Sequence, residues 1–520
     1  MLSKEANGST SFNMTESILR PSRERGQDND LALICSDEIV TYSQLWTRVN
    51  KAGNAFLELD ITSGDRVILM VRDTPEFFYI YLGLMKIGAV PIAINLRLKA
   101  TDVAYTMNDS KAKAIILDGV FLDAYQNIAK DVLLRPEIIV TDFDYDGLVY
   151  LPKIMKAAST ELDAVGLKEE DPALWMYSSG TTGKPKGVVH TQKLISGVNY
   201  WMGDVLGIGR GDRIFGSSKL FFAFSLAHCF LAPIKLGATV ILYPDWPDAA
   251  AVADIVEQHK PTILLSVPTF FRNMLREGVA DQSGFKNVRH YITAGEKLPQ
   301  KIFDSWLEAT DRPILEGVGA TETCFLFLAN RPDNINIGTS GIPTPETEVK
   351  LIKNDGTVIT KPGVSGVLWV KMRCIASGYW NMEQATSEVF KDGWYCTNDI
   401  FKFDTLGCFE YQGRIDDILK ISGQWVSPVE IEEEVLKHKA ISEAAIVGIR
   451  NDDGLVRLAL FIVVPELEGS KKLFEKELIK SLKANLSIYK CPRQIYFLDE
   501  MPLTATGKLQ RFVLRDLVEG

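Results

Sequence analysis

Hydrophobic and polar residues follow one another along the N-terminal part of the chain in blocks that predict a parallel β-sheet. Residues 65–71 (DRVILMV) and 89–94 (AVPIAI) are short apolar runs typical of buried strands, and the segment 74–88 between them has the length of a helix. A strand, a helix and a second strand in this order form the βαβ unit of a parallel sheet. The pattern recurs at 112–118 and 261–278 without a fixed period, which excludes a solenoid.

The pattern changes in the C-terminal part of the chain. From about residue 338 to 413, short β-rich pieces alternate with Gly, Pro and Asp turns, which indicates a small β subdomain. A polar stretch then leads to a helix at 429–438, strands at 443–449 and 458–464, and a helix at 471–486. These elements predict a separate α+β domain of about a hundred residues.

The predicted fold class is therefore α/β with two domains. Residues 1–415 form a large N-terminal domain made of two βαβ-layered parallel-sheet subdomains and a small β-barrel-like subdomain, and residues 416–520 form a small mobile α+β domain. A chain of 520 residues is too long for a single hydrophobic core. Its hydrophobic content of 46% and charged content of 24% are ordinary for a folded protein.

Charge and composition narrow the function classes. A net charge of -10 argues against a general nucleic-acid binder, which would present a basic surface. The most apolar run, 220–234, is shorter than the roughly 20 residues that cross a membrane. The N-terminus has no apolar signal-peptide region, so we expect a cytoplasmic protein without a membrane partner. Seven cysteines without CxxC spacing fit neither a disulfide framework nor a zinc site, and we expect buried, reduced thiols.

A glycine-rich loop at residues 177–187, YSSGTTGKPKG, carries the first chemical signal. Its glycines allow tight turns with exposed N–H groups, and its hydroxyls and lysines add donors and positive charge, which predicts a cradle for polyphosphate. A Walker A motif is excluded, because Ser178 stands where that motif requires Gly and Pro185 follows Lys184. Composition alone leaves an exposed flexible loop as the alternative.

The complete string resembles the phosphate loop of the adenylate-forming superfamily, which comprises acyl-CoA synthetases, adenylation domains and luciferases. Four further segments resemble that family's motifs in the family's order. They are the adenine and magnesium segment EGVGATET (316–323), the ribose strand WYCTNDIF (394–401), the hinge GRIDDILKISGQWVSPVEIE (413–432) and the lysine loop PLTATGKLQR (502–511). Agreement at five ordered places over more than 330 residues makes chance negligible.

The resemblance implies an enzyme that joins a carboxylate to the α-phosphorus of ATP, expels pyrophosphate and passes the acyl group to the thiol of coenzyme A. A carboxylate is already a nucleophile, so the site must stabilise negative charge rather than supply a base. Lys508 would bridge the carboxylate and α-phosphate oxygens, and Thr321 would bind the α-phosphate. Glu322 would hold Mg²⁺ together with ATP.

The resemblance also implies residues that bind the rest of ATP and the second substrate. The phosphate contacts are Ser178, Ser179, Gly180, Thr181, Thr182, Gly183, Lys184 and Lys186; the adenine is bordered by Gly295, Glu296, Glu316, Gly317, Val318 and Gly319; and the ribose is held by Asp399 and Arg414. The small domain would rotate about the hinge residue Asp416 and bring Ser422 and Gly423 to the coenzyme A tunnel. Asn398 occupies a place where the family usually has Gly.

Within the superfamily the chain resembles the benzoate-type branch, the aryl-CoA ligases that act on benzoate or anthranilate. That resemblance rests on KLFFAF (219–224), LFLANRP (326–332) and GTSGIP (338–343). The acyl pocket would be lined by Ala223, Phe224, His228, Gly319 and Phe325.

Two positions bear on the acid's ring substituent, which stays open at this point. Those ligases commonly carry His where this chain has Phe325. His228 is either a polar handle for an ortho amino or hydroxyl group or a buried structural histidine.

Three alternatives use the same motifs. A stand-alone aryl acid adenylating enzyme would load the phosphopantetheine of a carrier protein instead of coenzyme A. A catalytically silent nucleotide-binding protein would be expected to lose residues such as Lys508 and Asp399 first. A luciferase-like oxygenase would emit light. A homodimer is the family's common habit, so a second copy of the chain is the expected macromolecular partner.

Overall fold

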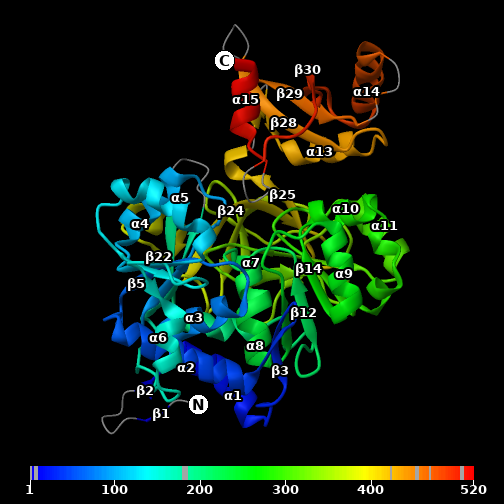
Figure 1. Cartoon of the computed structure of the whole chain (residues 1–520). Coiled ribbons are helices and arrows are strands. Elements are labelled where there is room, and N and C mark those ends of the chain that lie inside the picture. Colours follow the sequence, from blue (N-terminus) through cyan, green and yellow to red (C-terminus); the bar gives the residue numbers. More distant parts are fainter. Residues whose placement is uncertain are drawn as a thin grey trace. The chain divides into compact units, whose positions relative to one another are not determined.

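The structure of the protein is a computed structural model, shown in Figure 1. It describes residues 3–4, 10–178, 185–417, 419–421, 424–450, 456–465, 467, 470–503 and 509–519. The chain divides into two compact units, of which the first comprises Met1–Val349 and Val370–Tyr395 and the second comprises Lys350–Trp369 and Cys396–Gly520. The domain boundary expected between residues 415 and 416 stays a prediction.

The first unit contains an eight-stranded sheet with the order β22-β11-β10-β6-β5-β7-β8-β9. Its strands are β5 (Arg66–Met70), β6 (Val90–Ala93), β7 (Ala114–Leu117), β8 (Glu137–Val140), β9 (Val149–Tyr150), β10 (Pro172–Ser178), β11 (Lys186–Thr191) and β22 (Gly378–Tyr379). Strands β10, β6, β5, β7, β8 and β9 are parallel, as the βαβ pattern predicts. Strand β11 turns back antiparallel on β10, and β22 pairs antiparallel with β11.

Helices pack on this sheet because their apolar side chains bury against the apolar side chains of its strands. The helices are α2 (Tyr42–Glu58), α3 (Pro75–Lys86), α4 (Ala100–Ser110), α5 (Leu122–Ile128) and α6 (Leu151–Ala157). Val103 and Met107 of α4 and Tyr125 of α5 pack in one buried cluster with Ile68 and Ile115 of the strands. Helix α3 is buried along its whole length, which explains why its sequence is apolar on every face.

A second sheet of the first unit has nine strands in the order β18-β17-β16-β15-β14-β12-β13-β3-β4. Its strands are β3 (Leu31–Cys35), β4 (Glu38–Thr41), β12 (Arg213–Gly216), β13 (Thr239–Leu242), β14 (Ile263–Ser266), β15 (His290–Thr293), β16 (Ile314–Gly319), β17 (Leu326–Ala329) and β18 (Ile342–Pro343). Strands β3, β13, β12, β14, β15 and β16 are parallel.

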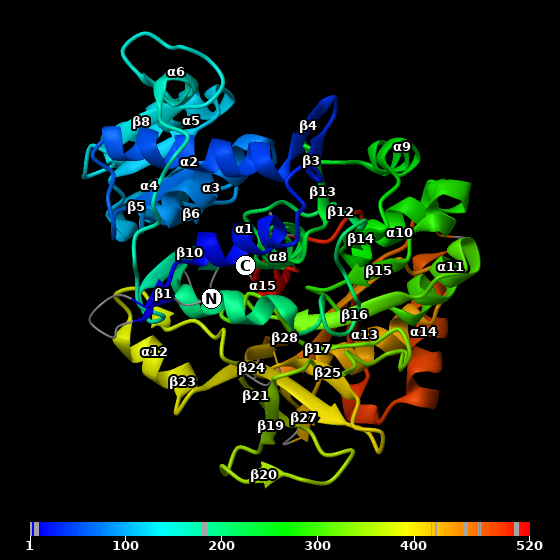
Figure 2. The same cartoon turned by 90° about the horizontal axis from the view of Figure 1, so that it is seen from below.

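One face of the nine-stranded sheet is covered by helices α9 (Ala249–His259), α10 (Pro268–Arg276) and α11 (Gln300–Thr310), which lie together in Figure 1. Their apolar side chains surround the fully buried Trp306. Helix α1 (Met14–Glu24) packs against both α3 and α8 (Ala232–Leu236), so it connects the helices of the two sheets (Figure 2).

The second unit contains residues 350–369 and 396–413 of the predicted β-rich segment together with the predicted α+β segment, and residues 338–349 and 370–395 of the β-rich segment belong to the first unit. The β-rich segment forms a sheet of order β20-β19-β21-β24-β23 with β25 beside β24, and the α+β segment forms the three-stranded sheet β28-β29-β30 and the hairpin β26-β27. The elements of these sheets and the helices that accompany them are β19 (Glu348–Ile352), β20 (Val358–Ile359), β21 (Gly366–Lys371), β23 (Phe390–Lys391), β24 (Trp394–Phe403), β25 (Phe409–Arg414), β26 (Leu419–Ile421), β27 (Gln424–Val426), α13 (Pro428–Leu436), β28 (Glu443–Arg450), β29 (Val456–Val463), α14 (Lys471–Asn485), β30 (Gln494–Leu498) and α15 (Arg511–Glu519).

An ion pair ties the last helix to the rest of the second unit. Arg511 at the start of α15 donates from Nη1 to Oε1 of Glu432 at 2.5 Å and from Nη2 to Oε2 at 3.0 Å. The same Nη1 donates to the carbonyl oxygen of Ile446 in β28 at 2.7 Å. This bidentate geometry fixes α15 against α13 and β28.

The predicted fold class is confirmed. All seven cysteines are buried and unpaired, as the sequence predicts. Among the described residues, no helix combines the length and the apolar character that a membrane crossing requires. Within the same residues, no group of three or more His, Cys, Asp or Glu side chains could hold a metal ion.

Candidate active site

The parallel strands of the nine-stranded sheet bring two predicted site residues to one edge. Gly295 follows β15 and Thr321 follows β16, so both come after the carboxyl ends of neighbouring parallel strands. Lys219, which is not a predicted site residue, follows β12 at the same edge. In open α/β sheets this edge is where ligands bind. The hydroxyls of Ser217 and Ser266, 2.6 Å apart, join the ends of β12 and β14 at the same edge.

A tight loop, Ala320–Phe325, connects β16 to β17 and carries Thr321 and Glu322. The hydroxyl of Thr323 accepts from the amide of Ala320 at 3.1 Å and donates to the carbonyl of Phe325 at 2.9 Å. Cys324 adopts a φ of 58°, a left-handed conformation that is unusual for a residue other than Gly, Asn or Asp. Such conformations are kept where the surrounding structure holds them, and they cluster at functional sites.

The carboxylate of Glu322 is buried and held in place. Its Oε1 accepts a hydrogen bond of 2.7 Å from the hydroxyl of Tyr379 in β22. Lys186 at the start of β11 lies with Nζ 5.1 Å from the centre of the Tyr379 ring, within cation–π distance. Tyr379 therefore contacts both Lys186, in the strand that follows the glycine-rich loop, and the carboxylate of Glu322.

His190 connects β11 to the same loop. Its Nε2 lies 2.8 Å from the carbonyl oxygen of Thr321, and because a carbonyl only accepts, Nε2 carries the proton. The other ring nitrogen, Nδ1, is buried without a partner among the described residues. Burial lowers the pKa of His190 to about 4, so its ring is neutral near pH 7.

The segment expected to border the adenine is held to β16 by Glu316. Its two carboxylate oxygens accept from the hydroxyl of Ser340 at 3.2 Å and from the amide of Leu298 at 3.3 Å. Gly295, three residues before Leu298, has a φ of 93°, where a side chain would be strained. Gly319 at the end of β16 is exposed.

The predicted acyl-pocket residues lie together. They come from α7 (Ala223–Ser225), from the π-helical turn Leu226–Leu231, from the end of β16, which carries Gly319, and from the end of the loop Ala320–Phe325. The ring of His228 lies 5.3 Å from that of Phe224 and 5.6 Å from that of Phe325, measured between centroids. π-helical turns are rare and frequent at functional sites.

A buried lysine anchors the segment that leads into this pocket. Nζ of Lys219 donates to the carbonyl oxygens of Tyr243 at 2.8 Å, Pro244 at 3.1 Å and Asp245, and lies 3.6 Å from Oδ2 of Asp73. Only 2% of Lys219 and 6% of Asp73 are exposed. Burial raises the pKa of Asp73 to about 6 against the opposing effect of Lys219.

Two predicted ribose-binding residues lie in the second unit, on neighbouring strands. Asp399 of β24 and Arg414 of β25 are register partners, with Nη1 of Arg414 3.5 Å from Oδ1 of Asp399. Asn398 has a φ of 58°, in the left-handed region. Asn is among the few residues that tolerate this conformation, which explains how it occupies a glycine position of the family.

Two family models match the sequence. The AMP-binding enzyme model matches residues 22–380, and the model of the AMP-binding enzyme C-terminal domain matches residues 430–508. The chain belongs to the AMP-binding enzyme family. Its predicted family is thereby confirmed.

Curated relatives of this AMP-binding enzyme include two hydroxybenzoate ligases. The 3-hydroxybenzoate–CoA/4-hydroxybenzoate–CoA ligase of Thauera aromatica is 40% identical over 100% of both chains. The 3-hydroxybenzoate–CoA ligase of Aromatoleum sp. (strain CIB) is 40% identical over 98% of this chain and 97% of its own. Both are aryl-CoA ligases, the kind of enzyme that the sequence predicts.

A solved structure of the same kind matches the fold over its whole length. The crystal structure of the anthranilate CoA ligase AuaEII in complex with anthranoyl-AMP superimposes with a TM-score of 0.90 at 31% identity, covering 98% of this chain and 97% of that one. Anthranoyl-AMP is an aryl adenylate, the kind of intermediate that the sequence motifs imply.

Some predicted site residues lie outside the described residues. They are Ser179, Gly180, Thr181, Thr182, Gly183, Lys184, Ser422, Gly423 and Lys508. The strands beside the phosphate loop are described, and Ser178 of β10 pairs with Lys186 of β11 across an antiparallel register. For Asp416 the structure describes only the backbone, in a short 3₁₀ turn at Ile415–Asp417.

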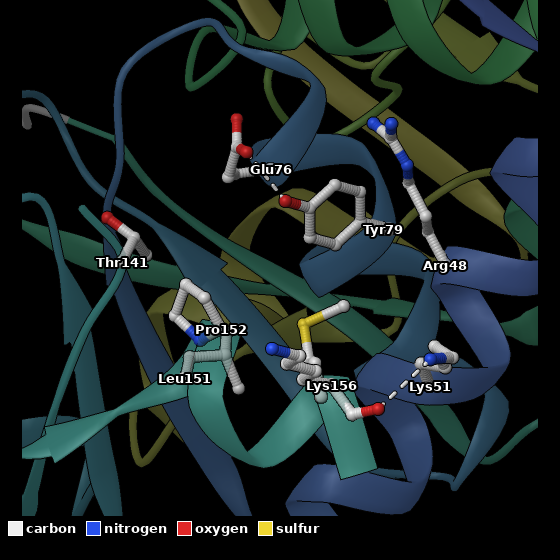
Figure 3. Close-up of a pocket in the computed structure, with 9 residues that line it drawn as sticks. Arg48, Lys51, Glu76, Tyr79, Thr141, Leu151, Pro152 and Lys156 are labelled. Carbon is white, nitrogen blue, oxygen red and sulfur yellow. Dashed lines mark hydrogen bonds between the residues drawn. The ribbon is translucent and has the colours of Figure 1, made fainter. Parts of the chain in front are cut away.

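A pocket of about 220 Å³ lies between α2, α3 and α6. Figure 3 shows Arg48 and Lys51 from α2, Tyr79 from α3 and Lys156 from α6 around it. The hydroxyl of Tyr79 donates to Oε1 of Glu76 at 2.7 Å, a tyrosine–glutamate pair like that of Tyr379 and Glu322. None of the pocket's lining residues belongs to the predicted site.

Sequence reasoning missed four residues that hold parts of the site in place, namely Tyr379, His190, Asp73 and Lys219. Each acts through a contact with a residue distant along the chain, such as the 147-residue separation between Asp73 and Leu220. One signal could have pointed to His190. Histidine is scarce in this chain, which has five, and two of them, His190 and His228, lie in this region.

Proposed function

We propose that this AMP-binding enzyme is an ATP-dependent aryl-CoA ligase. The carboxylate oxygen of an aromatic acid attacks the α-phosphorus of ATP and pyrophosphate leaves. The thiol of coenzyme A then attacks the acyl carbon, and AMP leaves. The loop Ala320–Phe325 carries the proposal, because it presents Thr321 and Glu322 beside β11 and β22 and places Phe325 against Phe224 and His228.

The first half-reaction needs positive charge and donors at the phosphates rather than a base. In this proposal the loop residues from Ser178 to Lys184 and Lys186 bind the β and γ phosphates, and Thr321 binds the α-phosphate. Lys508 neutralises the charge that develops between the carboxylate and the α-phosphate. The segment from Glu316 to Gly319, with Gly295 and Glu296, borders the adenine, and Asp399 with Arg414 binds the ribose.

Magnesium is part of the proposal, with Glu322 as its protein ligand. A single buried carboxylate suits Mg²⁺, which is usually held by one or two carboxylates together with substrate phosphates. Bound there, the ion would neutralise phosphate charge. Tyr379 keeps the carboxylate of Glu322 in one position by its hydrogen bond of 2.7 Å.

The second half-reaction needs Lys508 to withdraw after the adenylate has formed. We propose that residues 416–520 rotate about Asp416 and that Ser422 and Gly423 then line the path of the coenzyme A thiol. The division of the chain into domains 1–415 and 416–520 is part of this proposal.

We also propose that the enzyme is cytoplasmic and forms a homodimer. Light scattering of the purified protein measures the number of copies.

The acid is proposed to be of the benzoate type, and a hydroxybenzoate in particular. Two relatives that align over almost the entire chain act on 3- or 4-hydroxybenzoate. The sequence alone indicates benzoate or anthranilate, and both acids stay in the test. AMP release should be measured with coenzyme A and each of benzoate, anthranilate, salicylate, 3-hydroxybenzoate, 4-hydroxybenzoate and a medium-chain fatty acid. A preference for the fatty acid would contradict the proposal.

The role of Lys508 has a separate test. Lys508→Ala should abolish formation of the aryl adenylate and leave the reaction of supplied aryl adenylate with coenzyme A largely intact. Equal loss of both half-reactions would contradict the role. Replacing coenzyme A by a phosphopantetheinylated carrier protein in the same assay distinguishes a ligase from a carrier-loading enzyme.

A further inference from the structure

The side chain of His228 is enclosed by aromatic rings. Its ring centroid lies 5.3 Å from that of Phe224, 5.6 Å from that of Phe325 and 6.4 Å from that of Trp201. Only 1% of the residue is exposed. A polar side chain in such surroundings is costly unless each of its polar atoms has a partner.

One ring nitrogen of His228 has a partner, and this partner determines the tautomer. Nδ1 lies 2.8 Å from the carbonyl oxygen of Phe224. A carbonyl oxygen only accepts hydrogen bonds, so the proton of the neutral ring is on Nδ1 and Nε2 has a free lone pair. In the parts of the chain that the structure describes, Nε2 makes no hydrogen bond.

The ring keeps this acceptor under working conditions. Burial lowers the pKa of His228 to about 4, and the hydrogen bond to Phe224 opposes that shift only in part. At neutral pH the ring therefore has one donor, which is bonded to Phe224, and one acceptor, which makes no hydrogen bond to any described residue.

The acceptor lies among the residues of the proposed acyl pocket. Phe224 and Phe325 both contact the His228 ring, and the thiol of Cys324 lies 3.9 Å from the carbonyl oxygen of Ala223. The turn Leu226–Leu231 that carries His228 is π-helical and follows α7 directly. An aromatic acid bound against Phe224 and Phe325 would place its ring substituents near a neutral acceptor in apolar surroundings.

We propose that Nε2 of His228 accepts a hydrogen bond from the ring hydroxyl of the aryl substrate and thereby selects a hydroxybenzoate. The inference rests on the proposed aryl-CoA ligase function. A hydroxyl fits because it donates to the lone pair. A methoxy group does not, because it has no hydrogen to donate. Benzoate leaves the acceptor unsatisfied, which costs binding in an apolar site.

The wild-type enzyme gives the first test. Values of kcat/KM are measured for 3- and 4-hydroxybenzoate, for the matching methoxybenzoates and for benzoate. The preferred hydroxybenzoate should exceed both its methoxy analogue and benzoate by about ten- to a hundred-fold, the range expected for one buried hydrogen bond. If benzoate is used as well as either hydroxybenzoate, the inference is overturned while the ligase function stands. If no aromatic acid releases AMP, both are overturned.

A variant series gives the second test and separates recognition from folding. His228→Leu removes the acceptor and should lower kcat/KM for the preferred hydroxybenzoate about ten- to a hundred-fold more than kcat/KM for benzoate. His228→Gln offers a side-chain oxygen and should restore part of the selectivity. Equal losses for benzoate and hydroxybenzoate in His228→Leu would mean that the residue only supports the pocket. A variant that does not fold leaves the wild-type comparison to decide.

Discussion

The hydroxyl group of Tyr379 donates a hydrogen bond of 2.7 Å to Oε1 of Glu322. The two residues are 57 positions apart, one on the edge strand β22 and the other in the loop after β16. The bond fixes the carboxylate of Glu322, a residue that is 8% exposed and that we propose as the protein ligand of Mg²⁺. The edge strand of one sheet thus positions a residue of the proposed site that follows a strand of the other sheet.

Removing this hydroxyl should weaken adenylate formation. Tyr379→Phe should lower the rate of ATP–pyrophosphate exchange about ten- to a hundred-fold, since a hydrogen bond to a charged group contributes about 1.5–3 kcal/mol. Tyr79→Phe is the matched control, because it removes a 2.7 Å bond to Glu76 away from the predicted site. Similar exchange rates for the two variants would contradict the role of Tyr379.

Lys219 provides a test of the proposed acid-binding segment, which is the stretch from Lys219 to His228 that leads into the acyl pocket. Lys219→Met leaves three carbonyl oxygens and the buried Asp73 without their ammonium partner, and such a loss costs about 3–5 kcal/mol. The segment that follows Lys219 should then be less well held, and KM for the aromatic acid should rise about tenfold more than KM for ATP, the equivalent of about 1.4 kcal/mol.

Lys86→Met is the control for that variant. Lys86 is also buried, with Nζ 2.9 Å from Glu16 and 2.8 Å from Asn50, and its contacts are to α1 and α2 rather than to the acid-binding segment. Both variants should unfold at lower temperature than the wild type. A rise in KM for the acid in both would show that general destabilisation explains the effect.

Because the ring of His190 is buried and neutral, we expect the folded protein to become less stable in acid. Its pKa is about 4 in the folded protein and about 6.5 when unfolded, so the unfolded state binds the proton first as the pH falls. The contribution is fully present above pH 6.5 and is lost towards pH 4, by at most about 3 kcal/mol. Between pH 7 and 5 the melting temperature of the wild type should therefore fall more than that of His190→Asn. Parallel profiles would contradict the neutral, buried state of His190.

The ion pair of Arg511 with Glu432 allows a test of what stabilises the second unit. Arg511→Met leaves the carboxylate of Glu432 buried without its partner, and breaking such a pair costs about 3–5 kcal/mol. The double variant Glu432→Gln, Arg511→Met should be more stable than Arg511→Met, because residue 432 is then uncharged and no buried charge at that position lacks its partner. Thermal unfolding monitored in the second unit measures both, and additive losses would refute the coupling.

The sequence predicts the fold and the local motifs well because both depend on neighbours along the chain. The apolar runs that form β5 and β6, and the helix-length segment between them that forms α3, are visible in a short window of sequence. The carboxylate of Glu322 is identifiable for the same reason, since its motif is contiguous. The tautomer of His228 is different, because it is set by the backbone oxygen of Phe224 in a π-helical turn that no local pattern announces.

The supporting contacts could not be read from the sequence because they join distant segments. Tyr379 and Glu322 meet only because β22 pairs with β11, and Lys219 meets Asp73 only because two strands of different sheets end near each other. Pairing of this kind depends on tertiary packing. The sequence therefore indicates the residues proposed to do the chemistry more readily than the residues that hold them in place.

Every cysteine of the chain is buried, and burial raises the pKa of Cys35 to about 11 and that of Cys374 to about 12. Disulfide exchange requires a thiolate that the other sulfur can reach. An enzyme of this family works beside a free thiol and its oxidised dimer, yet this chain offers neither of them a reactive sulfur. Mixed disulfides with its own substrate are thus prevented by packing, and its activity should be insensitive to the redox state of the coenzyme A pool.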